Sequence, residues 1–395
     1  MIPITKPTLG DEEIAAVSEV LQSGWVSQGP RVAQFEQAFA AYVGAEYACA
    51  VSSCTTALHL ALLTIGVEPG DEVITVSHSF IATANSIRYC GATPVFVDIS
   101  PDTFNMDPSL IESAISERTK SILCVHQVGM PCDLTSIIEI ASRYGLPVIE
   151  DAACAIGSEI QIGGSWERIG KPHGDIACFS FHPRKLITAG EGGMLTTKNA
   201  DWDRRFRLLR QHCMSIPDTK RHSSSDVVFE NYPDVGFNFR MTDIQAAVGC
   251  EQLKRLAEIV GERRERAARY LSLLTEIPGL GLPIEPEWAR SNWQSFCVRL
   301  PEGYDQRQVM QSMLDAGVAT RRGIMCSHRE AAYSNDKWSC SAKIHGCCEC
   351  NTGYCQRLRY SEEAQDKTII LPLFPQMTFA QQDQVVEALC NALLK

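Results

Sequence analysis

The sequence lacks the features of membrane proteins and nucleic-acid-binding proteins. No uninterrupted apolar run approaches the roughly 20 residues that span a bilayer, and no apolar stretch follows a charged start at the N-terminus. The 36 lysines and arginines form no basic stripe, because they are interspersed among 47 acidic residues, and the formal net charge is −11. We therefore expect a cytoplasmic protein that binds neither nucleic acid nor membranes, in which an anionic substrate would need a local basic pocket.

Internal repeats and low-complexity linkers are also missing. Single hydrophobic cores stop growing at about 250–300 residues, so a chain of 395 residues is expected to form two domains. We place a large domain at residues 1–255 and a smaller one at residues 256–395.

Short apolar runs alternate with helix-length segments in the first two hundred residues. The expected strands cover residues 48–51, 72–76, 94–97, 121–125 and 147–149, and helices are expected at residues 12–21, 32–43 and 55–65. This alternation predicts a doubly wound, mostly parallel α/β sheet, which binds ligands at the carboxyl ends of its strands. A long helix from the possible cap Thr242-Asp243 to Leu274 is expected to bridge the domains. The smaller α+β domain should contain a strand at residues 296–300 and helices at 306–316 and 379–394.

Seventeen cysteines are many for a cytoplasmic protein. Most stand singly in expected strands and helices, where a free thiol packs as a small hydrophobic group. The exception is a cluster within residues 334–359, formed by Cys340, Cys347, Cys348, Cys350 and Cys355. It contains one Cys-x-x-Cys spacing and no second pair to complete a standard zinc pattern, so we expect an insertion without metal and keep zinc as the alternative.

Lys185 lies between an apolar, strand-like entry and a glycine-rich exit, and Asp151 ends an earlier strand-like run. A lysine held in a pocket can form a Schiff base with an aldehyde, because burial favours its neutral, nucleophilic form. Pyridoxal phosphate needs such a lysine together with a carboxylate at its pyridinium nitrogen. Taken alone, Lys185 could equally be an ordinary loop lysine.

The motifs around both residues extend this interpretation. Ser-Phe-His-x-x-Lys at residues 180–185 is followed by Glu-Gly-Gly, and Glu-Asp-Ala-Ala precedes it at 150–153. In this order and spacing, the sequence resembles the DegT/DnrJ/EryC1/StrS family of sugar aminotransferases over nearly the whole chain, except between about 334 and 359. Further segments agree at residues 24–30, 52–58, 82–85 and 236–241. The resemblance implies the fold type I of pyridoxal-phosphate enzymes, which is like that of aspartate aminotransferase.

The resemblance also implies a binding site for the cofactor phosphate. Cys54 and Thr55 lie where a strand ends and a helix begins, beside the positive end of the helix dipole. Cys54 departs from the glycine or alanine usual in the family, and Thr55 could instead merely cap the helix. Ser180 is similar to a family serine that contacts the same phosphate. Asn238 resembles an asparagine that reaches the phosphate from a neighbouring subunit, which implies a homodimer with shared sites; otherwise it stabilises a turn.

Four more residues take family positions at the cofactor or substrate. Phe80 corresponds to an aromatic that stacks on the cofactor ring, although such a residue is otherwise more often in a core. Cys154 stands where the family usually has Gln or His at the phenolic oxygen of the cofactor, and a thiol is a weaker hydrogen-bond donor. His182 could contact the substrate as a proton shuttle, but orientation of its loop by hydrogen bonding is the favoured interpretation. His328 falls in a segment similar to the family's substrate loop of the smaller domain, which implies contact with the sugar or the amino donor.

The resulting prediction is a pyridoxal-phosphate aminotransferase that converts a keto sugar, nucleotide-linked in our preferred reading, to an amino sugar in polysaccharide or lipopolysaccharide biosynthesis. L-Glutamate would be the amino donor, pyridoxamine phosphate the intermediate cofactor form, and Lys185 with Asp151 the catalytic residues. Alternatives are an aminotransferase for a non-nucleotide keto sugar or sugar acid, a pyridoxal-phosphate-binding regulatory protein without turnover, and a cysteine-processing enzyme of the same fold. A dehydratase of the family is disfavoured, because that branch has His in place of the lysine.

Overall fold

The computed structural model describes residues 1–216, 227, 229–333, 338–340 and 355–394. Its centre is a seven-stranded sheet with the strand order β1-β9-β8-β5-β4-β2-β3. These strands are β1 (Tyr47–Val51), β2 (Glu72–Val76), β3 (Thr93–Val97), β4 (Thr119–Val125), β5 (Val148–Asp151), β8 (Ile176–Ser180) and β9 (Gly193–Thr197). The strands from β8 to β3 are parallel, and β9 runs antiparallel to both of its neighbours. The predicted doubly wound, mostly parallel sheet is confirmed.

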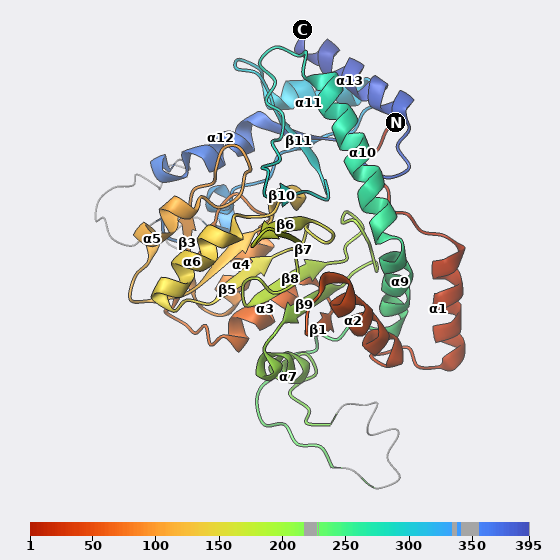
Figure 1. The fold of residues 1–395 in the computed structure, drawn as a ribbon, viewed down its shortest axis with the longest axis vertical. Coiled ribbons are helices and arrows are strands. Elements are labelled where there is room, and N and C mark those ends of the chain that lie inside the picture. Colours follow the sequence, from red (N-terminus) through yellow and green to blue (C-terminus); the bar gives the residue numbers. More distant parts are fainter. Residues whose placement is uncertain (217–226, 228, 334–337, 341–354, 395) are drawn as a thin grey trace.

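Helices pack around this sheet (Figure 1), and β2, β8 and β9 are buried along their whole length. The helices are α1 (Asp11–Ser23), α2 (Pro30–Val43), α3 (Cys54–Thr64), α4 (Ala82–Tyr89), α5 (Ile111–Ala114), α6 (Leu134–Tyr144), α7 (Ala200–Leu209) and α9 (Asp243–Lys254). Thr242 caps α9 through the backbone N–H of Gln245, as its position predicts. The capping role considered for Thr55 is wrong: Ser53 caps α3 and accepts a hydrogen bond from the N–H of Thr56.

The long helix expected from Thr242 to Leu274 is two helices. α9 ends at Lys254, and α10 (Leu256–Leu274) begins after Arg255. The Arg255 guanidinium forms an ion pair with Glu13 of α1. The backbone N–H of Arg255 donates to the carbonyls of Gln252 and Leu253, which tightens the last turn of α9. The apolar pattern runs through this break, so the pattern alone could not reveal it. The two helices continue upward to the region of α11 and α13 (Figure 1).

A second hydrophobic cluster lies at the far end of α10. The elements around it are β11 (Phe296–Arg299), α11 (Gln306–Asp315), β12 (Arg321–Arg322), α12 (Arg359–Lys367), β13 (Thr368–Leu371) and α13 (Phe379–Leu393). Its strands form a sheet in the order β11-β13-β12, and the N-terminal Ile2 joins this cluster and pairs with Val318. The smaller domain therefore has the expected α+β composition, while the domain division at residue 255 stays a prediction.

Several short elements lie outside the sequence prediction. A small sheet in the order β10-β6-β7 joins the two parts of the chain. It consists of β6 (Glu159–Ile162), β7 (Ser165–Arg168) and β10 (Ala289–Arg290). Short 3₁₀ helices are η1 (Pro108–Leu110), η2 (Gln127–Gly129), η3 (Ser327–Arg329), η4 (Ala331–Tyr333) and η6 (Gln356–Leu358).

The cysteine-rich segment is described only in part. Ser339 pairs with the edge strand β3, and the half-buried Cys340 and buried Cys355 belong to a small hydrophobic cluster with Phe96. The other three cysteines, Cys347, Cys348 and Cys350, lie outside the described residues. Within the described part of the chain, no group of three or more His, Cys, Asp or Glu side chains is arranged to hold a metal ion, and no helix is long and apolar enough to cross a membrane.

Candidate active site

A cavity of about 510 Å³ lies at the carboxyl ends of the parallel strands. It brings together side chains that follow β1, β2, β4, β5 and β8. Among the residues that line it are Cys54, Thr55, Phe80, Thr83, His126, Asp151, Cys154, Ser180, His182, Arg184, Lys185 and Glu191. Seven predicted cofactor residues and the predicted His182 thus share one cavity, whereas Asn238 and His328 do not line it.

Lys185 reaches Cys154 across this cavity. Its amine nitrogen lies 3.1 Å from the Cys154 sulfur, within hydrogen-bonding distance. Burial lowers the pKa of Lys185, but the Cys154 sulfur, its hydrogen bond and the Asp151 carboxylate outweigh burial and raise that pKa above its usual value. Burial alone would favour the neutral amine, as the sequence predicts. In the structure these neighbours favour the ammonium form instead.

Asp151 is a buried carboxylate held by two donors. The Thr83 hydroxyl donates to Oδ2 at 2.7 Å, and the Ala153 N–H donates to Oδ1 at 3.2 Å. The Ser79 hydroxyl lies 2.7 Å from that of Thr83, so a short hydroxyl chain leads to the carboxylate. Burial raises the pKa of Asp151, and the Thr83 hydrogen bond opposes this rise. The role of Thr83 was not recognised in the sequence, although it lies in the 82–85 motif.

The start of α3 forms the other end of the cavity. The N–H groups of Cys54 and Thr55 lie in the first turn, where a helix offers them no internal partner. Gly193 of β9 lies so close to this turn that a Cβ atom there would come within 2.4 Å of the Ser53 carbonyl carbon. Ser180 is buried beside it and accepts a weak hydrogen bond of 3.4 Å from the His182 N–H. These features suit a phosphate group.

The structure bears on the predictions made for Phe80 and His182. Phe80 lines the cavity with 69 % of its surface exposed, so the alternative that it belongs to the core is wrong. Burial lowers the pKa of His182, whose Nδ1 accepts a hydrogen bond from the Arg184 N–H at 3.2 Å. This bond matches the loop-orienting reading of His182.

The proposed substrate contact of His328 disagrees with its environment. His328 is buried, its Nδ1 lies 2.6 Å from the Ser77 hydroxyl, and its Nε2 lies 2.9 Å from a Glu362 oxygen. Both ring nitrogens are therefore used inside the protein.

Asn238 is exposed, and its backbone pairs with Gln211 in an isolated bridge.

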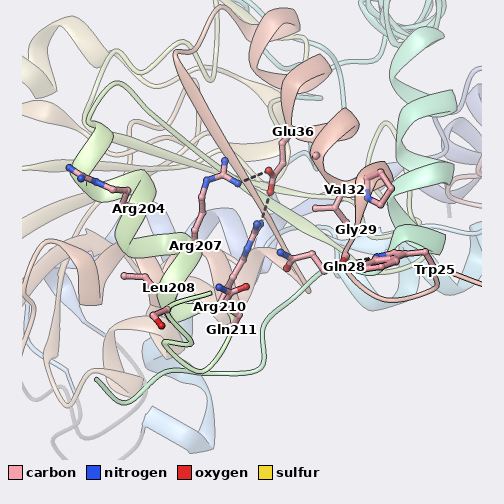
Figure 2. A pocket seen from close by; sticks show the side chains of 13 residues that line it. Trp25, Gln28, Gly29, Val32, Glu36, Arg204, Arg207, Leu208, Arg210 and Gln211 are labelled. Carbon is pink, nitrogen blue, oxygen red and sulfur yellow. Dashed lines mark hydrogen bonds and ion pairs between the residues drawn. The ribbon is translucent and has the colours of Figure 1, made fainter. Parts of the chain in front are cut away.

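A larger cavity, of about 790 Å³, lies between α2 and α7 (Figure 2). Its central acid, Glu36, forms ion pairs of 2.7 Å with Arg207 and 2.5 Å with Arg210, and the two guanidinium groups lower the Glu36 pKa against the effect of burial. Arg204, at the edge of the cavity, is paired with Asp201. Arg207 also pairs with Asp203, so every charged side chain that lines this cavity already has a partner of opposite charge. None of the predicted site residues lines it, and it offers no comparable chemistry.

The cavity with Lys185 fits pyridoxal phosphate. It offers a lysine amine, a buried carboxylate and an open helix terminus, which match the aldehyde, the ring nitrogen and the phosphate of that cofactor. This fold and this donor set define the class of pyridoxal-phosphate enzymes that share the aminotransferase fold.

Comparison with known proteins identifies the family. The model of the DegT/DnrJ/EryC1/StrS aminotransferase family matches residues 7–390, so the chain belongs to that family. It is 38 % identical over 388 residues to the spore coat polysaccharide biosynthesis protein SpsC of Bacillus subtilis (strain 168), covering 98 % of this chain and 96 % of SpsC.

Solved structures of similar proteins support the same family assignment. DesV of S. venezuelae, solved in complex with a ketimine intermediate, is 33 % identical with a TM-score of 0.85, covering 99 % of this chain and 98 % of DesV. The sugar aminotransferase Spr1654 of Streptococcus pneumoniae, in its PMP form, is 26 % identical with a TM-score of 0.89, covering 99 % of both chains, and a PLP form is also known. This chain is therefore a pyridoxal-phosphate-dependent sugar aminotransferase.

Proposed function

We propose that this enzyme transfers the amino group of L-glutamate to the carbonyl of a nucleotide-linked keto sugar, for polysaccharide or lipopolysaccharide biosynthesis in the cytoplasm. The observation that carries the proposal is the single cavity shared by Lys185, Asp151 and the start of α3. The likeness to SpsC, a polysaccharide biosynthesis protein, supports the sugar and its use.

The side chains that line the cavity have different proposed roles in this reaction. Bound pyridoxal phosphate supplies an electron sink that makes the hydrogen next to the amino group acidic. Lys185 would carry this proton between the substrate and the cofactor, first for the amino donor and then, in reverse, for the keto sugar. Asp151, which accepts a hydrogen bond from Thr83, would hold a proton at the ring nitrogen. The first turn of α3 and Ser180 would bind the phosphate, and Phe80 would stack on the ring.

We also propose a homodimer with shared sites. Asn238 is exposed and does not line the cavity of its own subunit, which leaves it available to the cavity of a partner. The segment before it carries four large apolar side chains that are more than half exposed: Val227, Phe229, Tyr232 and Val235. Such a run of exposed apolar groups supports a surface that a second copy covers.

The proposed reaction is tested by the absorbance spectrum of the protein loaded with pyridoxal phosphate, recorded before and after addition of L-glutamate. Conversion of the band of the lysine-bound cofactor to the pyridoxamine band is the expected result, and keto sugars with and without a nucleotide are then compared for the reverse conversion. A spectrum that ignores L-glutamate contradicts the proposed donor. Binding of the cofactor without conversion by any amino donor leaves the regulatory alternative, and failure to bind the cofactor contradicts both the enzymatic function and that alternative.

A further inference from the structure

A short segment of the chain, residues 291–295, connects the two sides of the lysine pocket. It follows β10 and leads directly into β11 of the smaller sheet. The Asn292 side chain is buried, and its Nδ2 donates to the backbone carbonyls of Cys154 and Ile156, each at 2.8 Å. Asn292 therefore holds the turn after β5 that places the Cys154 thiol.

The same segment reaches the loop that carries Lys185. Gln294 Nε2 donates at 2.9 Å to the carbonyl of Arg184, which belongs to the peptide bond between Arg184 and Lys185. Asn292 Oδ1 accepts from the backbone N–H of Gln294 at 2.8 Å, so the two side chains are linked. A continuous path of hydrogen bonds and short covalent links therefore joins the backbone of Cys154 to that of Lys185, whose side chains meet at 3.1 Å.

The backbone of this segment is strained and held in place. Trp293 has a φ of 52°, in the left-handed region that a large residue rarely adopts. Its N–H donates to Ser291 Oγ at 3.0 Å. The N–H of Asn292 donates to Ser158 Oγ at 3.1 Å, and that hydroxyl donates in turn to the Gly129 carbonyl at 2.6 Å. Strain of this kind persists only where the surrounding contacts enforce it, and it gathers at functional sites.

A buried arginine anchors the segment from α10. Arg263 has 1 % of its surface exposed, and its Nη1 donates to the carbonyls of Trp293 at 3.0 Å and Gln294 at 3.2 Å. A third bond of 3.2 Å goes to the carbonyl of Leu373, which follows β13. Burial lowers the pKa of Arg263 to about 10, so the group stays charged at neutral pH. A buried charge costs free energy, and fixing one conformation is an attested use of such a group.

We propose that Asn292 and Gln294 are positioning residues for transamination, which together fix the Lys185 amine relative to the opposite wall of the cavity. Neither is among the described residues that line the cavity, so they act through the backbone and not on the substrate. The inference rests on the proposed function, because it concerns the lysine to which proton transfer is assigned. Proton transfer is sensitive to placement, since a displacement of about 1 Å can lower a rate about a hundredfold.

The test compares Gln294→Met with the wild type, both loaded with pyridoxal phosphate. Methionine has nearly the length of glutamine but cannot donate to the Arg184 carbonyl, and the half-buried position of Gln294 should leave the fold intact. The first measurement is the rate at which L-glutamate converts the cofactor band, as a function of L-glutamate concentration. We expect the maximal rate to fall about three- to tenfold, while the half-saturating concentration changes by less than about twofold.

The second measurement is the pH at which the absorbance band of the lysine-bound cofactor titrates. This spectroscopic pKa reports on the surroundings of the Lys185 nitrogen and does not depend on turnover. In Gln294→Met it should shift by about 0.5 or more, because the lysine is no longer held at a fixed distance from residue 154. A residue that only stabilised the fold would leave this titration unchanged.

Gln306→Met is the matched control. Gln306 Nε2 also donates to two backbone carbonyls, those of Gln365 at 2.9 Å and Thr368 at 2.6 Å, but both lie in the smaller domain. This variant should match the wild type in both measurements. Asn292→Asp is the second test variant, because it turns a carboxylate oxygen toward the two carbonyls that Asn292 now binds. It should change both quantities more than Gln294→Met does, and thermal unfolding checks that it folds.

The outcomes separate this inference from the proposed function. A wild-type maximal rate and a wild-type titration in Gln294→Met overturn the inference. Equal effects in Gln306→Met also overturn it, since they would indicate a general loss of stability. If Asn292→Asp does not fold, Gln294→Met decides alone. A wild type that binds the cofactor but ignores L-glutamate contradicts the proposed function instead, and the spectroscopic titration of the variants still tests the placement of Lys185.

Discussion

The amine of Lys185 and the thiol of Cys154 are direct neighbours, with 3.1 Å between nitrogen and sulfur. The Asn292 side-chain amide donates hydrogen bonds to the backbone carbonyls of Cys154 and Ile156, each at 2.8 Å, and so fixes the backbone that carries the thiol. The thiol thus has a defined place beside the lysine, and both can be tested by substitution.

Lys185→Ala should lower turnover by about a thousandfold or more, because it removes the group proposed to carry the proton. Steady-state transamination measures the loss, and circular dichroism with thermal unfolding checks the fold. Lys171→Ala is a matched control, since Lys171 pairs with Glu167 at the surface. Near-normal turnover in Lys185→Ala would refute the catalytic role.

Cys154→Gln should shift the pH at which the absorbance band of the lysine-bound cofactor titrates. A Gln amide is a stronger hydrogen-bond donor than a thiol, so it stabilises the ionised phenolic oxygen of the cofactor. We expect the spectroscopic pKa to fall, because that oxygen then holds the neighbouring proton less tightly. Cys154→Ser provides an intermediate donor of similar size. An unchanged titration in both variants would mean that residue 154 does not contact the cofactor.

Thr83→Val should raise the pKa of Asp151 further, because the hydroxyl bond opposes the effect of burial. On acidification, Asp151 would then become protonated at a higher pH than in the wild type. The acid limb of the pH–activity profile should therefore move to higher pH. We expect about tenfold lower turnover near neutral pH. Thr83→Ser keeps the hydroxyl and should retain the wild-type profile; a shift in Thr83→Ser as large as that in Thr83→Val would argue against the hydrogen bond as the cause.

Phe80→Ala should weaken cofactor binding without destabilising the protein. The ring is largely exposed in the cavity, so its removal leaves no core void. Loss of stacking should raise the cofactor dissociation constant about three- to tenfold, and Phe80→Tyr should restore it. Equilibrium titration with pyridoxal phosphate measures the change. A large fall in the melting temperature of the cofactor-free Phe80→Ala protein would instead indicate a core residue.

The sequence predicted the parts of this site that depend on strand ends. Asp151 ends β5 and Lys185 follows β8, so both line one cavity at the carboxyl edge of the parallel strands. The apolar runs predicted this edge, and the resemblance to the family identified the two residues. Contacts between side chains from distant segments could not be predicted in this way. Thr83 supports Asp151 from the first turn of α4. His328 was misplaced for the same reason, because its local motif contains no information about its partners Ser77 and Glu362.

The Glu362 carboxyl should make the free energy of unfolding depend on pH. Burial raises the pKa of this carboxyl to about 7, although the Cys355 N–H donates to it. The folded state therefore binds the proton more tightly than the unfolded state, whose carboxyl has a pKa near 4.5. The resulting stabilisation is complete below pH 4.5 and is lost as the pH rises through 7.

Glu362→Gln removes this dependence while keeping an oxygen that accepts from His328 and Cys355. Relative to the wild type, the variant should gain on the order of 2–3 kcal/mol in unfolding free energy between pH 5 and pH 8, measured by urea denaturation. Burial lowers the pKa of His328 to about 4, which destabilises the fold in both proteins as the pH falls below the ordinary pKa of histidine. Glu363→Gln is the control, since Glu363 pairs with Arg359 at the surface and should show no such trend. Parallel stability curves for Glu362→Gln and the wild type would show that Glu362 is ionised throughout and that its pKa is not raised.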